Sequence, residues 1–353
     1  MTDAYAKAGV HIDLANETIA RYQSILERHD DPRVLKGVGG FSGCFALQGY
    51  KNAVLAASTD GVGTKVLVTI ALHRYNTIGA DLVNHCINDL LCSNADPLFF
   101  LDYLAMGALE PETAADIVRG IAQACQTHSV ALLGGETAEM PGVYTPPHFD
   151  LAGTIVGAVE RDALINVLSV HAGDVIIGLP ANGLHTNGYS LARATLDQSR
   201  WSEPLAAGSG ETIGDALLAV HPCYLPYVRA VQRSGGAIKS MAHITGGGLV
   251  DNVPRALPDH LAARFDPSSW RIPRITELIV HEAGLSAEEA YRAFNMGIGF
   301  CMIVAREDAP GAVEAACAAL AECPIPGVLQ SAAVVGEVEP RHPCGPSVII
   351  GGR

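Results

Sequence analysis

The sequence predicts an α/β (α+β) protein of two domains, and three observations support this. Apolar runs of strand length alternate with segments that have the 3.6-residue apolar period of helices. This alternation comes in two separate sets, each of which can form a sheet with its own covering helices. The chain has 353 residues, of which 49% are hydrophobic and 17% charged. That size and composition favour two packed cores over a disordered chain.

The first set of elements predicts an N-terminal domain, residues 1–165, with a mixed sheet and helices. Its strands are short apolar runs, expected near residues 54–59, 98–106, 130–133 and 151–159. Two segments between these runs have the helical period, residues 79–92 and 111–128. We place the domain boundary in residues 160–173, which have no apolar period of their own.

The second set predicts a C-terminal α/β sandwich domain, residues 166–353. Its strands are expected near residues 175–179, 299–304, 332–338 and 347–350. Its helices are expected near residues 189–196, 223–233, 286–294 and 310–321. No fixed-period repeat and no low-complexity tract interrupts this pattern.

Charge and cysteine content exclude several classes of protein. The 37 acidic and 23 basic residues give a net charge of −14, which argues against binding to a nucleic-acid backbone. No stretch approaches the roughly 20 apolar residues of a membrane span, and the N-terminus lacks the pattern of a secretory signal. The nine cysteines are scattered and never form C-x-x-C, so we expect buried, reduced thiols, with Cys44 in the core. These features predict a cytoplasmic protein.

The segment Ser58-Thr-Asp-Gly-Val-Gly-Thr-Lys65 follows a predicted strand and has the composition of a phosphate and metal site. Its glycines let backbone N–H groups approach an anion, while Asp60 can hold Mg²⁺ and Lys65 can contact a phosphate. The phosphate-binding candidates are Thr59, Gly61, Gly63, Thr64 and Lys65, and Lys65 is also a catalytic candidate. The spacing is not that of a Walker A loop, and a plain tight turn fits the local pattern equally well.

The predicted helix at residues 79–92 carries its polar residues on one wedge. These residues are Asp81, Asn84, His85, Asn88 and Asp89. A solvated face usually carries Lys, Glu, Gln or Arg, whereas short side chains of this kind suit close binding of a hard cation or a ligand. An exposed polar stripe is the alternative. His85 taken alone is interpreted as a hydrogen-bonded structural residue.

A short apolar strand runs into Gly134-Gly-Glu136, where a turn would normally favour Asn, Asp or Ser over Glu. Glu136 is therefore a candidate for a further metal-facing carboxylate. Glu139 has a weaker claim, because it can simply face solvent. The phosphate-binding candidates beside Glu136 are Gly134, Gly135 and Thr137.

Two glycine-containing turns in the second half, residues 183–190 and 244–249, each lead into a helix. Backbone N–H groups at a helix start bind phosphate without cationic side chains, which suits an acidic protein. His185 and Asn187 in the first turn are catalytic candidates, with His185 proposed for proton transfer or oxygen stabilisation. The phosphate-binding candidates of the second turn are Thr245, Gly246, Gly247 and Gly248. The loop at residues 36–43 can close over a nucleotide as a lid.

These motifs together resemble those of the phosphoribosylformylglycinamidine cyclo-ligase (AIR synthetase) family, over essentially the whole chain. The residues that carry the resemblance are Tyr5-x-x-Ala-Gly-Val-x-Ile-Asp13-x-x-Asn16, Gly39-Gly-Phe41, Ser58-Thr-Asp-Gly-Val-Gly-Thr-Lys65, Asn88-Asp-Leu90, Pro97-Leu-Phe-Phe-Leu-Asp-Tyr103, Gly134-Gly-Glu-Thr-Ala-Glu-Met-Pro-Gly142, His185-x-Asn-Gly-Tyr-Ser190, His243-Ile-Thr-Gly-Gly-Gly248 and Tyr291-Arg-x-Phe-Asn295. The resemblance implies an N-terminal sheet that pairs across a homodimer into a barrel. It also implies that Asp60, Asp89 and Glu136 hold magnesium and the ATP phosphates, and that both turns of the second half serve the active cleft.

The activity implied by the resemblance is ATP-dependent ring closure of formylglycinamidine ribonucleotide (FGAM) to aminoimidazole ribonucleotide (AIR), with release of ADP and phosphate, in purine biosynthesis. The implied cofactors are ATP and Mg²⁺, and the implied partners are a phosphoribosyl substrate and a second copy of the chain. One alternative is another member of the superfamily, such as a thiamine-phosphate kinase or a selenophosphate synthetase. A second is a non-catalytic nucleotide-binding module, which would not need three metal-facing carboxylates.

The sequence departs from the family pattern at two places. Asn94 stands where the family usually has glycine, and because Asn tolerates positive φ we expect the turn to survive. The usual Pro-Thr-x-x-Tyr is here Ala219-Val-His-Pro-Cys-Tyr-Leu225, which leaves the details of that loop open. Neither departure removes a predicted ligand.

Overall fold

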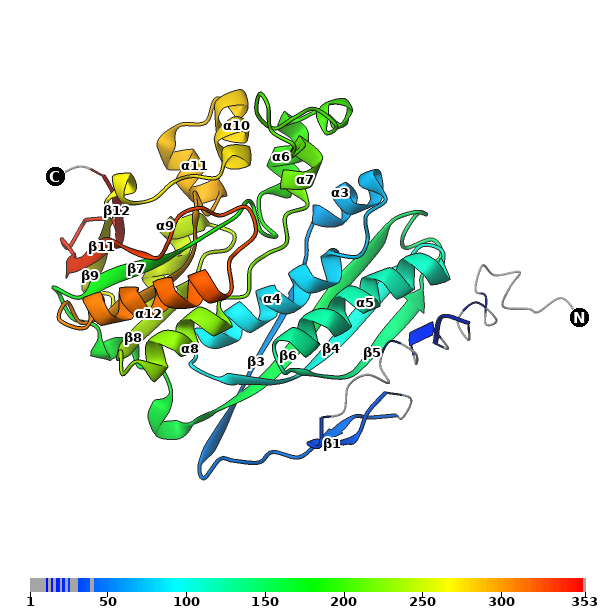
Figure 1. Ribbon diagram of the computed structural model, residues 1–353, viewed down its shortest axis with the longest axis horizontal. Coiled ribbons are helices and arrows are strands. Elements are labelled where there is room, and N and C mark those ends of the chain that lie inside the picture. Colours follow the sequence, from blue (N-terminus) through cyan, green and yellow to red (C-terminus); the bar gives the residue numbers. More distant parts are fainter. Residues whose placement is uncertain are drawn as a thin grey trace, which may run out of the picture. The chain divides into compact units, whose positions relative to one another are not determined.

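The computed structural model (Figure 1) describes residues 11, 14, 17–19, 21–22, 25, 31–38 and 41–351. The chain folds into two compact units. The first comprises residues 1–90 and 95–163, and the second comprises residues 91–94 and 164–353. Most of the predicted motif at residues 5–16, together with Gly39 and Gly40 of the predicted lid, lies outside the described residues.

The first unit contains a four-stranded mixed sheet in the order β3-β6-β4-β5. Its strands are β3 (Ala53–Gly61), β4 (Asp96–Met106), β5 (Ala131–Glu139) and β6 (Phe149–Glu160). β6 pairs antiparallel with β3 and β4, whereas β4 and β5 are parallel. A two-stranded ribbon of β1 (Val34–Lys36) and β2 (Cys44–Phe45) accompanies the sheet.

Helices cover one face of this sheet (Figure 1). They are α3 (Lys65–Leu72), α4 (Ile78–Leu91) and α5 (Pro111–Thr127). α4 lies close to β6 because that strand carries glycines: a Cβ at Gly153 would lie 3.0 Å from the Leu82 side chain, and one at Gly157 would lie 2.5 Å from Leu90. The opposite face exposes large apolar side chains, with Leu55 62% and Tyr103 41% exposed.

The second unit contains a six-stranded sheet in the order β12-β9-β11-β7-β10-β8. Its strands are β7 (Val175–Pro180), β8 (Ile238–His243), β9 (Leu261–Phe265), β10 (Ile298–Val304), β11 (Ala333–Pro340) and β12 (Val348–Ile350). All neighbours are antiparallel except β12 and β9. Every residue of β7 and β10 is buried, so these central strands form the core of the unit.

The helices of the second unit are α6 (Tyr189–Thr195), α7 (Ile213–Leu217), α8 (Leu225–Arg233), α9 (Gly248–Asn252), α10 (Arg274–Ala283), α11 (Ala287–Ala293) and α12 (Ala309–Glu322). Short 3₁₀ turns occur at Arg161–Ala163 in the first unit and at Val167–Ser169, Gln198–Arg200, Val253–Ala256 and Pro267–Ser269 in the second. α8 packs beside α12, where the Tyr227 hydroxyl donates to the Cys323 carbonyl at 2.7 Å. None of the described helices is long and apolar enough to cross a bilayer.

The mixed α/β class predicted from the sequence is confirmed, and two local expectations are wrong. β5 continues to Glu139, so Gly134-Gly-Glu136 lies within a strand instead of a turn. Cys44 is exposed on β2 instead of buried, although all nine cysteines are free thiols.

Candidate functional site

Two predicted metal ligands and one histidine meet in the first unit, where the end of β3 faces α4. His85 Nε2 lies 2.7 Å from Asp60 Oδ2 and 3.8 Å from Asp89 Oδ2. Asp89 also accepts a 3.0 Å hydrogen bond from the Ser58 hydroxyl. His85 and Asp89 share a face of α4 because they are four residues apart. One ligand atom from each of Asp60, His85 and Asp89 lies within 4.8 Å of the others, which fits a divalent cation.

The charges of this cluster favour ionised carboxylates. Burial alone would raise the pKa of Asp60, but its contact with His85 and the amide of Gly61 lower it below the ordinary value. Burial acts to lower the pKa of His85, and the neighbouring Asp60 and Asp89 outweigh that effect and raise it. When protonated, His85 neutralises part of the charge of the two carboxylates, which a cation can also bind.

The polar wedge of α4 is not a solvated stripe. Asp81 and Asn88 have no exposed surface, His85 is 2% exposed and Asn84 is 7% exposed. The side chains of Asp60 and Asp89, by contrast, are 43% and 28% exposed. α4 therefore buries most of its polar groups, while Asp89 of α4 and Asp60 of β3 stay partly accessible.

Lys65 of α3 is paired with an acidic residue of α4. Its side chain is fully buried, and Nζ forms a 2.8 Å ion pair with Asp81 Oδ1, also fully buried. Burial lowers the pKa of Lys65, and the contact with Asp81 counteracts that effect. The ammonium is thus paired with a carboxylate of α4, and the phosphate contact of Lys65 stays a prediction.

The loop between β3 and α3 keeps the geometry of a close-approach turn. Gly63 has a φ of +57°, and the Asp60 carboxylate accepts the Gly61 amide at 2.7 Å. Thr64 is the N-cap residue of α3, without a side-chain hydrogen bond to the helix. Thr59 contacts Thr154 of β6 at 2.8 Å between hydroxyl oxygens. Since side chains alternate along a strand, Thr59 lies on the face opposite Asp60.

Within one chain the structure does not bring Glu136 to Asp60 and Asp89. Asp60 pairs with Gly153, and Tyr103 pairs with Glu136. β3 and β5 are the outer strands of the sheet, separated by β6 and β4, a distance of about 14 Å at ordinary strand spacing. Glu136 is exposed on the edge strand. Thr137 beside it contacts the Tyr22 hydroxyl at 3.1 Å.

Asp102 is a carboxyl group beside this stretch that the sequence did not single out. It is paired with Gly135, where a Cβ would lie 2.2 Å from Asp102 Oδ1, so the glycine leaves room for the carboxyl. Burial raises the pKa of Asp102 to about 7. A single half-buried aspartate within an apolar strand has no sequence pattern that would have predicted its raised pKa.

In the second unit the first predicted turn precedes α6. His185 has a φ of +62°, and a Cβ at Gly299 of β10 would lie 2.6 Å from its Cε1 atom, so the ring packs against a glycine. The His185 carbonyl accepts the hydroxyl of Tyr189 at 3.1 Å. Asn187 Nδ2 donates to the Thr186 hydroxyl at 3.4 Å. The His185 ring is therefore packed against β10, and Asn187 contacts its neighbour within the turn.

The second turn, Thr245–Gly248, is organised by a residue that the sequence did not single out. The side-chain amide of Asn252 donates to the carbonyls of Thr245, Gly246 and Gly248, at 3.3, 3.0 and 2.9 Å. Gly247 is the N-cap residue of α9, with a φ of +93°. Because Asn252 occupies the carbonyls, this arrangement favours a turn whose N–H groups are offered to an anion. The sequence feature that could have indicated this role of Asn252 is an Asn placed one helical turn after a run of glycines.

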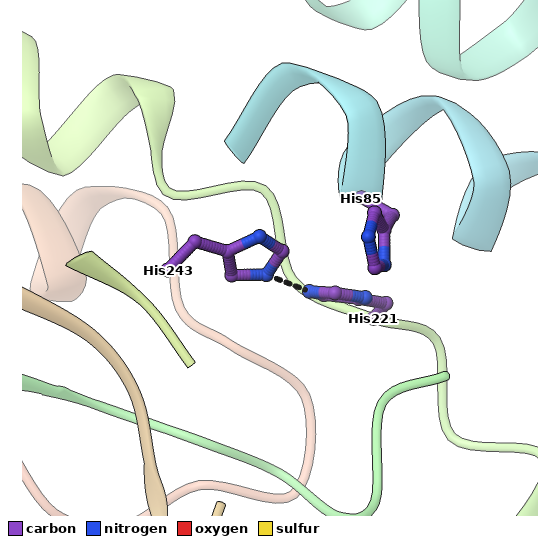
Figure 2. A group of neighbouring side chains, drawn as sticks. All are labelled: His85, His221 and His243. Carbon is purple, nitrogen blue, oxygen red and sulfur yellow. Dashed lines mark hydrogen bonds between the residues drawn. The ribbon is translucent and has the colours of Figure 1, made fainter. Parts of the chain in front are cut away.

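A histidine pair lies between the two turns. His221 Nε2 and His243 Nε2 are 3.0 Å apart, as the dashed line in Figure 2 shows. His221 also stacks on His185, with ring centroids 4.2 Å apart. His243 is the last residue of β8 and directly precedes the second turn. No functional role was predicted for His221 or His243, which are 22 residues apart in the sequence and meet through the fold.

Comparison with known proteins gives a consistent result over the whole chain. The AIR synthase related protein family matches with its N-terminal domain at residues 42–159 and its C-terminal domain at residues 171–347. The phosphoribosylformylglycinamidine cyclo-ligase of a Thermoanaerobacter species is 43% identical over 336 residues, which cover 95% of this chain and 97% of that protein. The enzyme of the same name from Carboxydothermus hydrogenoformans is 48% identical over 305 residues, covering 85% and 88%.

Solved structures with a similar fold are more distant in sequence. Thiamine-monophosphate kinase from Stenotrophomonas maltophilia has a TM-score of 0.65 and 18% identity, with 96% of each chain covered. The hydrogenase maturation protein HypE from E. coli has a TM-score of 0.64 and 16% identity, covering 95% of this chain and 92% of that one. At such identities the likeness establishes the fold alone.

Proposed function

Because the chain belongs to the phosphoribosylformylglycinamidine cyclo-ligase family, we propose that it converts FGAM and ATP to AIR, ADP and phosphate in purine biosynthesis. The observation that carries this proposal is the identity of 43% over nearly the full length of both proteins. It favours the cyclo-ligase over a kinase of the same fold, since the kinase structure is only 18% identical.

The reaction needs activation of an amide oxygen, which is a poor leaving group. The oxygen attacks the γ-phosphate of ATP and displaces ADP. An amidine nitrogen of the same substrate then attacks the activated carbon, phosphate leaves with the oxygen, and the nitrogen gives up a proton. The protein contributes positioning of the oxygen in line with the γ-phosphate and stabilisation of charge on the transferring group.

The first unit supplies the groups suited to ATP phosphates and magnesium. Asp60 and Asp89 would hold Mg²⁺, which when bound supplies positive charge to the phosphates. The exposure of their side chains, 43% and 28%, and the buried His85 beside them support this assignment. Glu136 is the third proposed ligand, and its place on an edge strand means that a single chain does not complete the set. Glycines of the loop after β3 and of β5 are proposed to contact phosphates.

The second unit supplies two turns suited to phosphate and to the reacting amide. The turn Thr245–Gly248, held by Asn252, is proposed to bind phosphate through its N–H groups. His185 and Asn187 are proposed to contact the reacting amide, with His185 stabilising the oxygen or moving the proton. Their anchoring by Gly299 and Thr186 supports a positioning role.

We further propose a homodimer that covers the open face of the first unit's sheet. Leu55 and Tyr103 on that face are 62% and 41% exposed, and an apolar sheet face of this kind favours association. The nine free cysteines support a reducing compartment, the cytoplasm, as the place of action.

The reaction is tested by incubating the purified protein with FGAM, ATP and Mg²⁺ and measuring AIR. The Asp60→Asn variant is the matched control, because it keeps side-chain volume and removes the charge of one proposed ligand. AIR formation by the parent protein and its loss in the variant are expected. Failure of the parent protein to form AIR would contradict the proposal.

A further inference from the structure

The histidine pair of the second unit has a geometry that constrains its protons. His221 has no exposed surface and His243 is 4% exposed, and their Nε2 atoms are 3.0 Å apart (Figure 2). A hydrogen bond between two ring nitrogens at this distance needs one hydrogen, donated by one ring and accepted by the other. Two N–H groups would repel, and two bare nitrogens would leave the contact without a hydrogen.

The second nitrogen of the His221 ring, Nδ1, also has a hydrogen-bond partner. Nδ1 lies 3.4 Å from the Thr186 hydroxyl, and that hydroxyl accepts the side-chain amide of Asn187 at 3.4 Å. A neutral imidazole has one donor and one acceptor nitrogen. Which ring carries the shared hydrogen therefore determines whether the Thr186 hydroxyl accepts from His221 Nδ1 or donates to it. The direction of that hydrogen bond in turn affects the hydrogen bond between the same hydroxyl and Asn187.

These contacts join the two turns. Thr186 and Asn187 belong to the first turn, and the residue after His243 begins the second. Asn187 Oδ1 lies 3.3 Å from the position of a Cβ at Gly246, so the turns also meet directly where glycine leaves room. The stacking of His221 on His185, with ring planes 21° apart, fixes the first turn from a second direction.

We propose that His221 is a positioning residue that couples the two ligand turns of the second unit through one hydrogen shared with His243. The expected effect of His221 on activity rests on the proposed function. The hydrogen bond between His221 and His243 does not depend on it. His221 stands in the segment where the chain departs from the family pattern. It holds Asn187 and the glycine turn in one arrangement for the phosphoribosyl substrate.

The link is tested directly by NMR of protein labelled with ¹⁵N-histidine, without substrate. A scalar coupling across the hydrogen bond between the Nε2 atoms of His221 and His243 is expected, and it should vanish in His221→Phe. Absence of this coupling in the parent protein would overturn the link even if the enzyme is active. A coupling in a protein that forms no AIR would leave the link standing and contradict the proposed function.

The effect on activity is tested with two variants and a control. His221→Phe keeps a ring to stack on His185 and removes both nitrogens, so kcat/KM for FGAM should fall about tenfold, the size of one lost hydrogen bond, while KM for ATP is unchanged. His221→Gln can still bond to His243 and should recover part of the loss. His281→Phe, an exposed site on α10, should behave as the parent. Equal loss in the Phe and Gln variants, or equal effects on both substrates, would overturn the positioning role.

Discussion

Lys65 Nζ and Asp81 Oδ1 lie 2.8 Å apart, and neither side chain has exposed surface. The pair joins the first residue of α3 to α4, one helical turn before His85. It therefore fixes the loop after Asp60 against the helix that carries Asp89. Since a buried charge is costly without its partner, this ion pair helps to hold the proposed phosphate loop in place.

Removing one partner of this pair should destabilise the protein strongly. Lys65→Met or Asp81→Leu leaves an uncompensated buried charge, so each should lower the free energy of unfolding by about 3–5 kcal/mol. The double variant, which removes both charges, should lose less than either single variant. Urea unfolding of the three variants measures this, and additive losses in the double variant would show that the pair is not coupled.

The three proposed metal ligands should be needed for turnover but not for folding. Asp60→Asn, Asp89→Asn and Glu136→Gln each remove a charge without core volume, so each should lower kcat about 100-fold or more and raise the Mg²⁺ requirement. Thermal melts should stay close to that of the parent protein. Asp116→Asn on the exposed face of α5 is the control. A near-normal rate in any one variant would remove that residue from the metal site.

Local pattern predicted the parts of the site that lie close together in sequence. Asp60 was expected just after a strand and lies near the end of β3, and helix periodicity placed His85 and Asp89 on one wedge. The family resemblance joined Asp60 to Asp89. The turn at Asn94 also formed as expected, with a φ of +63°, and the Asn94 side chain accepts the amide of Gln232 at 2.6 Å.

Contacts over long sequence distances could not be predicted in this way. Lys65 ends a segment with the composition of a phosphate site. Only the contact between α3 and α4 in the structure shows that its ammonium forms an ion pair with Asp81. His221 and His243 meet because β8 ends beside the loop before α8. Gly134-Gly-Glu136 has turn composition, yet pairing with β4 extends it as a strand, which moves Glu136 to the far edge of the sheet.

Asp102 should make stability depend on pH. Burial raises its pKa to about 7 in the folded protein, against about 3.9 in an unfolded chain. The folded state therefore holds a proton that the unfolded state loses, so this contribution to stability is full below about pH 4 and declines as the pH rises to about 7.

Asp102→Asn removes that titration and keeps the volume. The free energy of unfolding of the variant relative to the parent protein should be larger at pH 8 than at pH 5, as measured by urea unfolding. Asp116→Asn, at an exposed site, should show no such change. A constant difference between Asp102→Asn and the parent at both pH values would contradict the assignment.

The open sheet face should carry the dimer contact. Leu55→Asp places a charge in that face, where the parent residue is 62% exposed, so the variant should sediment as a monomer at micromolar concentration while the parent sediments as a dimer. Leu329→Asp, on an exposed apolar residue of the second unit, is the matched control and should stay dimeric. A parent protein that is an active monomer would contradict the proposed dimer.

The measurement that tests the central claim most directly follows ADP, free phosphate and AIR together, with and without FGAM and Mg²⁺. In this reaction the γ-phosphate has no acceptor until the amide oxygen of FGAM is in place. The account therefore predicts that ADP, free phosphate and AIR form in equal amounts and that all three depend on both FGAM and Mg²⁺. A phosphorylated product without free phosphate would contradict the account, as would ATP hydrolysis that proceeds at the same rate without FGAM.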